Sequence, residues 1–461
     1  MQAPFDIAAD LDTPVSAYLK LRELRPRFLL ESVEGGERLA RYSFLGFGDA
    51  LEVRLDANGF AVDGVARAYP GSRAEYLELL RDALGRAPRP QPEVNGLPFT
   101  GGLVGVSGYD VVRLFEHLPR KTSPQAGVPD AAFSATSSAL VFDHLTRRVA
   151  LLHDGSAAER HSLRRDVVNL LRGPNALNGH AVSTSKPEPA MNEKQYAERV
   201  AACKEYIAAG DIYQIVLSVL FRGRSNVPPF QVYRALRLLN PSPYMFFFEF
   251  GDLKVVGSSP EALVRLHGRT ASLRPIAGTS PRGATPGEDA QNEARLLADP
   301  KEAAEHVMLV DLARNDLGRV AKAGSIAVDP YRAIERYSHV MHIVSGVQGE
   351  LAPEYDAFDL FAASFPAGTL VGAPKVRAMQ IIEEMEQTGR GLYAGTAGYF
   401  GLGGDMDQAI TIRTLVFNGD EYSFQAGAGI VADSIPAKEF QEVLAKSAIL
   451  RNALILAGEG L

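Results

Sequence analysis

The sequence predicts an α+β protein with large antiparallel sheets flanked by helices. Three observations lead to this prediction. The chain of 461 residues is 46% hydrophobic and 22% charged, so it can bury a large core. Its 43 Gly and 28 Pro are spread along the whole length, which is typical of many strands and turns. Short apolar runs alternate with amphipathic helical stretches, and the chain has no repeat of fixed period, which argues against a solenoid or propeller.

A shift in composition divides the chain into two segments. Residues 173–192, GPNALNGHAVSTSKPEPAMN, carry Pro, Asn, Ser and Gly where periodic apolar residues would otherwise stand, which predicts a connecting loop. Residues 1–172 form an N-terminal segment that favours strands, such as those around residues 51–55 and 139–142. Residues 193–461 form a larger and more regular segment.

The second segment is predicted to open with a helix that Asn192 caps together with Gln195, and that ends at Gly210. A strand follows over residues 212–221, and further strands are predicted around 254–257, 393–400, 408–417 and 422–431. Two more helices are predicted to begin after the capping residues Asp299 and Ser434.

Charge and motifs exclude several classes of protein. A net charge of −7 argues against a nucleic-acid partner, because such a protein needs a basic face to displace phosphate counterions. No apolar stretch approaches the ~20 residues of a membrane span, and the N-terminus lacks a secretory signal, so we expect a cytoplasmic protein with no membrane partner. Cys203 is the only cysteine and cannot form an internal disulfide. Phosphate-loop, zinc-helix, dinucleotide-loop and serine-hydrolase signatures are missing from the sequence.

Two predicted helices each carry a pair of carboxylates on one face. Glu302 and Glu305 are three residues apart on one helix, and Glu439 and Glu442 repeat this spacing on the other, with Lys446 one turn further on. Carboxylates of this kind suit Mg²⁺, which keeps part of its hydration shell and is often held by one or two carboxylates plus a substrate oxyanion. The alternative is an ordinary solvated helix face, and Glu302 could also complete a capping box with Asp299.

Three strand positions call for a partner or a ligand. Phe424 to Val431, FQAGAGIV, place small residues within a strand, which indicates either an approaching ligand or a β-bulge with tight sheet packing. Arg413 shares a predicted strand face with apolar residues, so it needs an anionic ligand or a structural carboxylate. Gln214 is a predicted buried amide that needs hydrogen-bond partners from the backbone or from a ligand.

Eight longer motifs together resemble the chorismate-utilising enzymes, and within them the large aminating subunits of anthranilate synthases. The resemblance spans nearly the whole chain. The motifs are LLESVEGGERLARYSFLG from Leu29, GGLVGVSGYD from Gly101, NPSPYMFFFEF from Asn240, SSPEALVR from Ser258, PIAGTSPRG from Pro275, EHVMLVDLARNDLGRV from Glu305, GTLVGAPKVRAM from Gly368 and AGAGIVADS from Ala426.

The resemblance implies the α/β sandwich of that family, with the N-terminal segment woven against the chorismate-binding segment. It implies that Glu305 and Glu442 hold Mg²⁺ and that Glu302 and Glu439 support them. The residues that it implies for binding the two carboxylates of chorismate are Gly278, Thr279, Tyr393, Arg413, Gly427, Ala428, Gly429 and Lys446.

The resemblance also implies a reaction: ammonia adds at C2 of chorismate with loss of the C4 hydroxyl, and pyruvate is then eliminated to give anthranilate. Glu261 would be the general acid for the hydroxyl, and Thr369 and His342 match active-site positions, with His342 assigned to the elimination. Relatives that add water carry a lysine base where this chain has Gln214, and an amide cannot deprotonate water. Relatives that aminate C4 often carry a nucleophilic lysine where this chain has Ala277.

The resemblance further implies a partner and an inhibitor. The chain lacks the residues of a glutamine amidotransferase, so a separate glutaminase subunit is expected, in a heterodimer or a dimer of heterodimers. Ser32, Pro243, Tyr244 and Met245 match a feedback site for L-tryptophan, the product of the pathway that anthranilate enters; the chain itself contains no Trp. Two alternatives stay open: an aminodeoxychorismate synthase component that works without the lysine, and an inactive homologue that binds chorismate or tryptophan for regulation.

Overall fold

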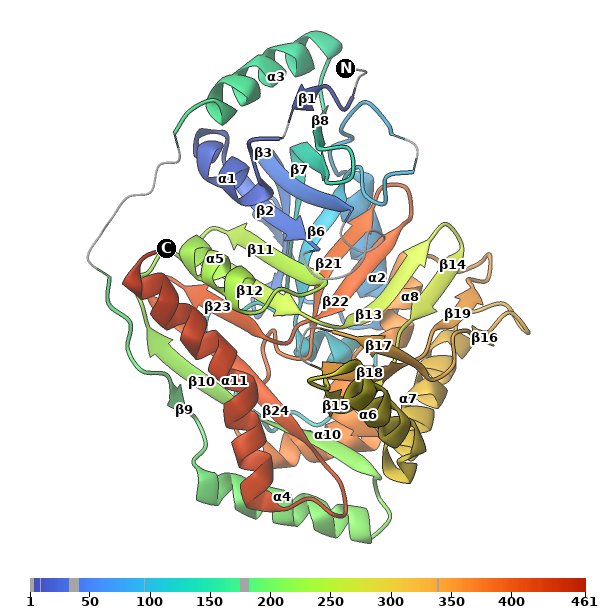
Figure 1. Cartoon of the computed structure of the whole chain (residues 1–461). Helices are drawn as coiled ribbons and strands as arrows, with labels where there is room; N and C mark the ends of the chain where they lie inside the picture. The colour runs from blue at the N-terminus through green and yellow to red at the C-terminus, as the bar shows by residue number, and fades with distance from the viewer. Residues whose placement is uncertain (1–3, 9, 33–40, 95, 175–181, 338–339) are drawn as a thin grey trace.

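The computed structural model describes residues 4–8, 10–32, 41–94, 96–174, 182–337 and 340–461. Helices flank a large, curled antiparallel sheet, which confirms the predicted α+β class (Figure 1). Within the described residues, a 21-stranded sheet and a separate 3-stranded sheet form, the second containing β15, β17 and β18. Among the helices of the described residues, none is both long enough and apolar enough to cross a bilayer.

The elements before residue 190 are mostly strands. The strands are β1 (Ile7–Ala8), β2 (Pro26–Glu31), β3 (Tyr42–Asp56), β4 (Gly59–Val62), β5 (Val65–Arg67), β6 (Gly102–Ser107), β7 (Ala131–Asp143), β8 (Arg148–His153) and β9 (Glu188–Pro189). The helices are α1 (Pro14–Lys20), α2 (Arg73–Gly85) and α3 (Ala157–Leu171), with 3₁₀ turns at Arg22–Leu24 and Tyr109–Leu114.

The elements after residue 190 alternate more evenly. The strands are β10 (Gln214–Arg224), β11 (Tyr244–Phe250), β12 (Leu253–Ser259), β13 (Ala262–His267), β14 (Thr270–Leu273), β15 (Ile276–Pro281), β16 (Ala327–Val328), β17 (Ala333–Arg336), β18 (Val340–Val344), β19 (Val347–Glu350), β20 (Gly372–Ala373), β21 (Thr396–Gly401), β22 (Met406–Ile410), β23 (Thr414–Asn418) and β24 (Glu421–Ile430). The helices are α4 (Glu193–Ala208), α5 (Pro229–Leu239), α6 (Pro286–Ala298), α7 (Pro300–Gly318), α8 (Ala357–Ser364), α9 (Gly368–Val371), α10 (Lys375–Met385) and α11 (Pro436–Glu459).

Strand pairing joins the two halves of the chain. β2 pairs with β11 and β6 pairs with β21, both antiparallel, so strands from before residue 190 lie directly beside later strands in one sheet. Part of the predicted connecting loop is itself on the sheet, because β9 pairs with β10. Residues 175–181 of that loop lie outside the described residues.

Local capping explains where two of the predicted helices begin. Asn192 caps α4, and its side chain and that of Gln195 form the reciprocal pair of bonds predicted from the sequence. Asp299 caps α7 by accepting hydrogen bonds from the backbone N–H groups of Lys301 and Glu302, with Pro300 at the first helical position. These bonds set where each helix starts and therefore which way its carboxylates point.

Two local predictions were wrong. Ser434 does not cap α11: its hydroxyl accepts a bond from the Val431 N–H in the turn after β24, and α11 begins at Pro436. The single strand predicted over residues 408–417 is two strands, β22 and β23, because β22 pairs with β13 and β21 whereas β23 pairs with β12 and β24. The chain changes neighbours between them, and Arg413 stands at the change with a left-handed φ of 49°.

Candidate active site

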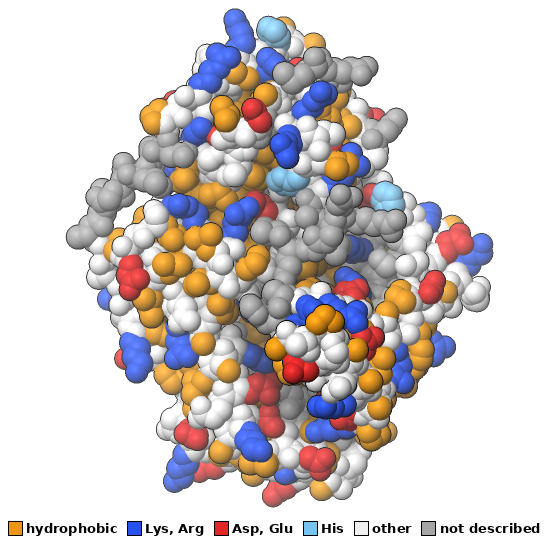
Figure 2. Space-filling view, viewed as in Figure 1, with side chains coloured by type: hydrophobic (Ala, Val, Ile, Leu, Met, Phe, Trp, Pro, Cys, Tyr) orange, Lys and Arg blue, Asp and Glu red, His pale blue; other side chains and the backbone are white. Residues whose placement is uncertain are grey.

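A cavity of about 560 Å³ lies where β10 and β24 meet α7, α9 and α11. Figure 2 shows acidic side chains in a recess between α11 and the lobe that contains α6 and β15. Twelve of the residues implicated by sequence line this cavity: Gln214, Glu261, Glu302, Glu305, Thr369, Tyr393, Arg413, Gly427, Gly429, Glu439, Glu442 and Lys446.

The four glutamates reach the cavity from two helices. Glu302 and Glu305 come from the first turns of α7, and Glu439 and Glu442 from the first turns of α11. Burial, followed by repulsion from Glu305, raises the pKa of Glu302 above its ordinary value. Glu302 is not engaged in a capping box, because Asp299 alone supplies the side-chain cap of α7. The carboxylate of Glu302 therefore adds negative charge to the cavity and does not cap the helix.

The glutamates suit a Mg²⁺ ion that keeps most of its bound water. The described residues contain no cluster of three or more metal-ligating side chains close enough to enclose an ion. Mg²⁺ does not require such a cage, since one or two carboxylates with waters and a substrate oxyanion suffice. In this structure Lys446 forms an ion pair with Glu442 at 2.6 Å, so the lysine neutralises part of the negative charge of the glutamates.

Glu261 is the carboxyl group with the most perturbed acidity among the residues lining this cavity. Burial raises its pKa to about 7, while a hydrogen bond from Thr369 and the charge of Arg413 act in the opposite direction. Thr369 Oγ1 donates to Glu261 Oε1 at 3.1 Å. A carboxyl group with this pKa is protonated in a large fraction of molecules near neutral pH, so it can donate a proton to a substrate.

The floor of the cavity is formed by β10 and β24. Gly427 lies opposite Ser218, and Gly429 opposite Val216, in the register of these strands. A Cβ on Gly427 would stand 2.7 Å from the Tyr393 hydroxyl oxygen and 2.7 Å from the Leu217 carbonyl oxygen, so only glycine fits. Lys446 Nζ donates to the Gly427 carbonyl oxygen at 3.2 Å. The small residues thus serve close packing and also leave the cavity open.

Four sequence-implicated residues do not line this cavity: Gly278, Thr279, His342 and Ala428. Ala428 is buried in β24. His342 lies on β18, where its Nδ1 is 3.0 Å from the Gly278 carbonyl oxygen and 3.1 Å from Thr279 Oγ1. Gly278 adjoins the cavity wall, because a Cβ there would be 3.0 Å from Glu302 Oε2. Burial lowers the pKa of His342, so its ring is neutral at physiological pH.

Comparison with known proteins places this arrangement in a family. Residues 25–452 match the family described as chorismate binding enzyme. The chain belongs to the chorismate-binding-enzyme family. It is 44% identical to anthranilate synthase component 1 of Aquifex aeolicus, over 98% of this chain and 94% of that protein. It is 43% identical to anthranilate synthase component 1 of Neisseria meningitidis serogroup B, over 99% of this chain and 95% of that protein.

A solved structure agrees with these sequence matches. The crystal structure of anthranilate synthase component I from Streptococcus pneumoniae superimposes on this chorismate-binding enzyme with a TM-score of 0.81 and 34% identity. The match covers 98% of this chain and all of that one. The predicted family and its sandwich fold are thereby confirmed.

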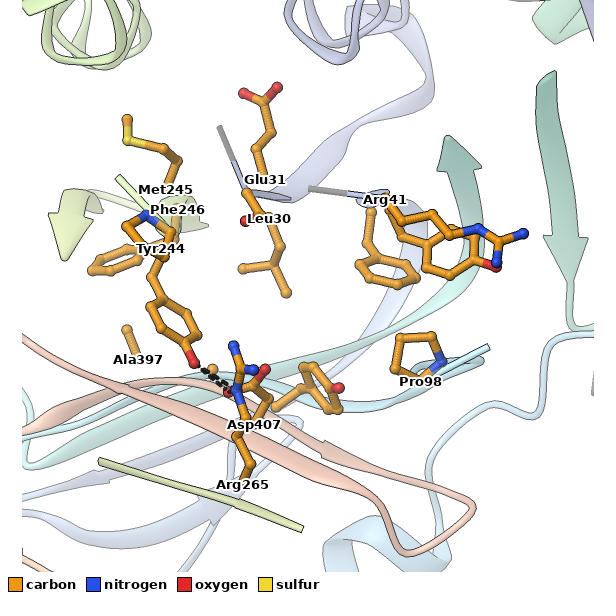
Figure 3. Close-up of a pocket in the computed structure, with 16 residues that line it drawn as sticks. Leu30, Glu31, Arg41, Pro98, Tyr244, Met245, Phe246, Arg265, Ala397 and Asp407 are labelled. Atoms are coloured by element: carbon orange, nitrogen blue, oxygen red, sulfur yellow. Dashed lines mark hydrogen bonds and ion pairs between the residues drawn. The ribbon is translucent and has the colours of Figure 1, made fainter. Parts of the chain in front are cut away.

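A second cavity, of about 240 Å³, collects the residues implicated in tryptophan binding. Ser32, Pro243, Tyr244 and Met245 all line it. Figure 3 shows Tyr244, Arg265 and Asp407 converging on one side: the Tyr244 hydroxyl donates to Asp407 Oδ1 at 3.0 Å, and Arg265 Nε lies 2.7 Å from that hydroxyl. The buried hydroxyl oxygen of Ser32 has no hydrogen-bond partner within the part of this chorismate-binding enzyme that is described.

Reasoning from the sequence missed several residues of the first cavity. Lys301 and Lys438 line it beside the glutamates and contribute positive charge that favours an anionic ligand. Each lysine directly precedes a glutamate of the proposed metal set, and that adjacency was the available signal. A buried ion pair of Arg390 and Glu386 behind the cavity was also missed. Sequence spacing shows that these two residues are four positions apart, after the end of α10, but not that Arg390 reaches three other segments.

Proposed function

We propose that this chain converts chorismate and ammonia to anthranilate and pyruvate with the help of Mg²⁺. The observation that carries the proposal is Glu261, whose pKa of about 7 makes it a proton donor in a cavity that also holds four glutamates and Gln214. The names of relatives over 40% identical along nearly the whole chain support the same activity.

Proton transfer in the first half of the reaction is assigned to Glu261. Loss of the C4 hydroxyl of chorismate requires a proton on the departing oxygen, and the protonated Glu261 supplies it. Gln214, in the same cavity, is a neutral amide that can hydrogen-bond but cannot act as a base toward water. Neutral ammonia is a stronger nucleophile than water and can add without prior deprotonation by a base, so amination is favoured over hydration.

Anion binding is assigned to the basic and hydroxyl groups of the cavity. Arg413, Tyr393 and Lys446 line the cavity and are assigned to the two carboxylates of chorismate, together with backbone N–H groups near Gly427 and Gly429. Glu305 and Glu442 would hold Mg²⁺, with Glu302 and Glu439 supporting them, and the ion would supply charge neutralisation at the ring carboxylate. Gly278, Thr279 and Ala428 are assigned to the wall behind this site.

Elimination of pyruvate requires a base, and we assign this role to His342. Its lowered pKa leaves the imidazole neutral, and its Nδ1 is engaged by the Gly278 carbonyl oxygen, so Nε2 is the nitrogen that can accept a proton. Closure of β15 and β18 toward the cavity would be needed, because His342 lies beside the cavity wall.

Ammonia is proposed to come from a separate glutaminase subunit, in a heterodimer or a dimer of heterodimers. Cys203 cannot serve as a glutaminase nucleophile, since it is buried in α4 and burial raises its thiol pKa to about 12. We assign the cysteine thiolate that such chemistry needs to that separate subunit.

The second cavity is proposed to bind L-tryptophan as a feedback inhibitor. Its apolar wall includes Phe44, Met245 and Phe246, and its polar groups include Arg41 and the hydroxyl of Ser32, which has no hydrogen-bond partner among the described residues. An amino acid with an indole ring needs this combination of apolar surface and polar anchors. The direct strand pairing of Tyr244 with Ser259, two residues before Glu261, supports an effect on catalysis.

The proposed activity is tested by mixing the purified chain with chorismate, Mg²⁺ and a high concentration of ammonium at mildly alkaline pH. Anthranilate fluorescence and mass spectrometry identify the products. Anthranilate and pyruvate are expected. An aminated product that retains the enolpyruvyl group would instead indicate C4 amination or a stalled elimination, and unchanged chorismate would indicate a regulatory homologue.

A further inference from the structure

Arg390 is a fully buried cation directly behind the proposed active site. Its side chain is 1% exposed, and that of its partner Glu386 is 4% exposed. The two form a bidentate ion pair, with Arg390 Nε 3.0 Å from Glu386 Oε2 and Arg390 Nη2 2.7 Å from Glu386 Oε1. Burying two charges is costly unless further hydrogen bonds satisfy them, so the other hydrogen-bond partners of Arg390 and Glu386 matter.

The remaining donors of Arg390 bind backbone carbonyls of two cavity-lining segments. Nη1 donates to the Leu370 carbonyl oxygen at 2.7 Å, at the end of the short helix α9. Nη2 donates to the Val216 carbonyl oxygen of β10 at 2.8 Å. Val216 and Leu370 both line the proposed active site. One guanidinium thus fixes two walls of the cavity relative to each other.

The guanidinium also lies near two aromatic rings. Its central carbon is 5.6 Å from the centre of the Tyr393 ring, which lines the cavity, and 5.0 Å from that of Tyr109. A cation over an aromatic face attracts the ring and limits its movement. Tyr393 is therefore held from behind while its hydroxyl stays near Gly427.

Glu386 connects the same pair to the cavity floor. Ser218, on β10, donates its backbone N–H and its hydroxyl to Glu386 Oε1, at 2.9 and 2.7 Å. Gln425, which lines the cavity from β24, donates to the Ser218 hydroxyl at 2.8 Å. The network therefore reaches β10, β24, α9 and Tyr393.

We propose that Arg390 is a positioning residue for the reaction: by holding α9, β10 and Tyr393 in one arrangement, it keeps the Thr369 hydroxyl on Glu261 and Tyr393 at the substrate. This inference rests on the proposed function. Thr369 precedes Leu370, whose carbonyl Arg390 binds, and Thr369 donates to Glu261. A lysine cannot replace this role, because a single ammonium lacks the planar fork that reaches a carboxylate and two carbonyls together.

The test compares Arg390→Lys with Arg113→Lys. Arg113 is a matched control: its side chain is only 10% exposed, pairs with Asp110 and Glu383 and donates to the Pro119 carbonyl oxygen, but none of these partners lines the cavity. Both variants should lower the thermal unfolding temperature. Only Arg390→Lys should lower kcat/KM for chorismate by tenfold or more and raise KM severalfold.

The pH profile separates positioning from a general loss of stability. Thr369 and Arg413 are the groups that lower the pKa of Glu261, and the cavity around them also contains Glu302, Glu305, Glu439, Glu442, Lys301, Lys438 and Lys446. If Arg390→Lys displaces Thr369, Glu261 stays protonated to higher pH, so the fall of kcat on the alkaline side should move upward. Thr369→Val should produce the same shift, and the double variant should shift no further than either alone.

Two additional measurements keep the proposal open to refutation. If Arg390→Lys does not fold, Ser218→Ala loosens Glu386 without removing a charge and should give a smaller shift in the same direction. Infrared titration of the Glu261 carboxyl band, assigned with Glu261→Gln, needs no turnover. Absence of anthranilate from the unaltered protein would refute the proposed function alone. An unchanged carboxyl titration in Arg390→Lys or Ser218→Ala, with normal kinetics for each folded molecule, would overturn the role of Arg390.

Discussion

Thr369 donates its hydroxyl proton to Glu261 at 3.1 Å, which joins residues 108 positions apart in the sequence. The bond lowers the pKa of Glu261 while burial raises it, and the result is a pKa of about 7. The bond from Thr369 thus limits how far burial raises the pKa of Glu261. The carboxyl group remains able both to give up a proton and to recover it within the physiological pH range.

The activity of the protein should fall as pH rises through about 7. The proposed role of Glu261 requires its protonated form, so raising the pH above its pKa of about 7 removes the reactive species. Measuring kcat with ammonia held at a constant unprotonated concentration isolates this limb. Glu261→Gln should lower kcat by about 10²–10⁴-fold, the range of general acid catalysis, and abolish the limb. A limb of unchanged position in that variant would assign it to another group.

Glu261→Gln should also stabilise the folded protein at alkaline pH. The pKa of Glu261 is about 7 in the folded state against a usual 4.5, so ionisation disfavours folding. The penalty is absent below the unfolded pKa, grows between pH 4.5 and 7, and is complete above it. We expect the free energy of unfolding of the variant to exceed that of the original by about 1–3 kcal/mol at pH 8.5. Urea unfolding at pH 8.5 and 5.5 measures this difference, which should shrink at the lower pH; an equal gain at both would contradict it.

Removing a metal-binding carboxylate should raise the Mg²⁺ requirement. Glu305→Gln and Glu442→Gln each keep the side-chain shape and remove a charge from the cavity. Titration of activity with Mg²⁺ should show at least a tenfold increase in the half-saturating concentration, because a neutral amide is a poorer ligand for a hard cation. Glu459→Gln, an exposed residue at the end of the same helix as Glu442, is the control. Normal Mg²⁺ dependence in Glu442→Gln would refute its assignment.

Removing the Ser32 hydroxyl should weaken inhibition by tryptophan without altering catalysis. The hydroxyl is buried in the second cavity with no partner in the described residues, so a bound ligand can satisfy it. Ser32→Ala should raise the tryptophan concentration for half inhibition by about 3–30-fold, the equivalent of one lost hydrogen bond of 0.7–2 kcal/mol. Ser134→Ala is the control. It removes a buried hydroxyl that also has no partner among the described residues but lies on β7, outside the cavity lining, and it should leave inhibition unchanged. Equal sensitivity in both variants would argue against a tryptophan site here.

Local sequence predicted local structure well where short-range bonds decide it. The capping box of Asn192 and Gln195 and the start of α7 at Pro300 were correct because their partners lie within three residues. Ser434 was assigned to the wrong turn by the same reasoning. Its hydroxyl had two competing local partners, and the bond to the Val431 N–H formed instead of a helix cap.

Long-range pairing decided what local patterns could not. The alternation over residues 408–417 indicated one strand, but two different sets of neighbours divide it at Arg413. That division turns Arg413 into the active-site cavity with a left-handed backbone. No periodicity reveals a change of partner strand, because strand partners are specified by residues far away in the sequence.

The sequence by itself determined the family and the α+β class and named the residues proposed to carry the chemistry, because long motifs in order preserve the side chains that a reaction needs. Tertiary structure alone decided the acidity of Glu261, the convergence of four glutamates from two helices and the burial of Arg390 behind Tyr393. Acidity and charge pairing depend on distance and on exclusion of water. Those quantities exist only after segments such as α7 and α11, more than 100 residues apart, have packed around one cavity.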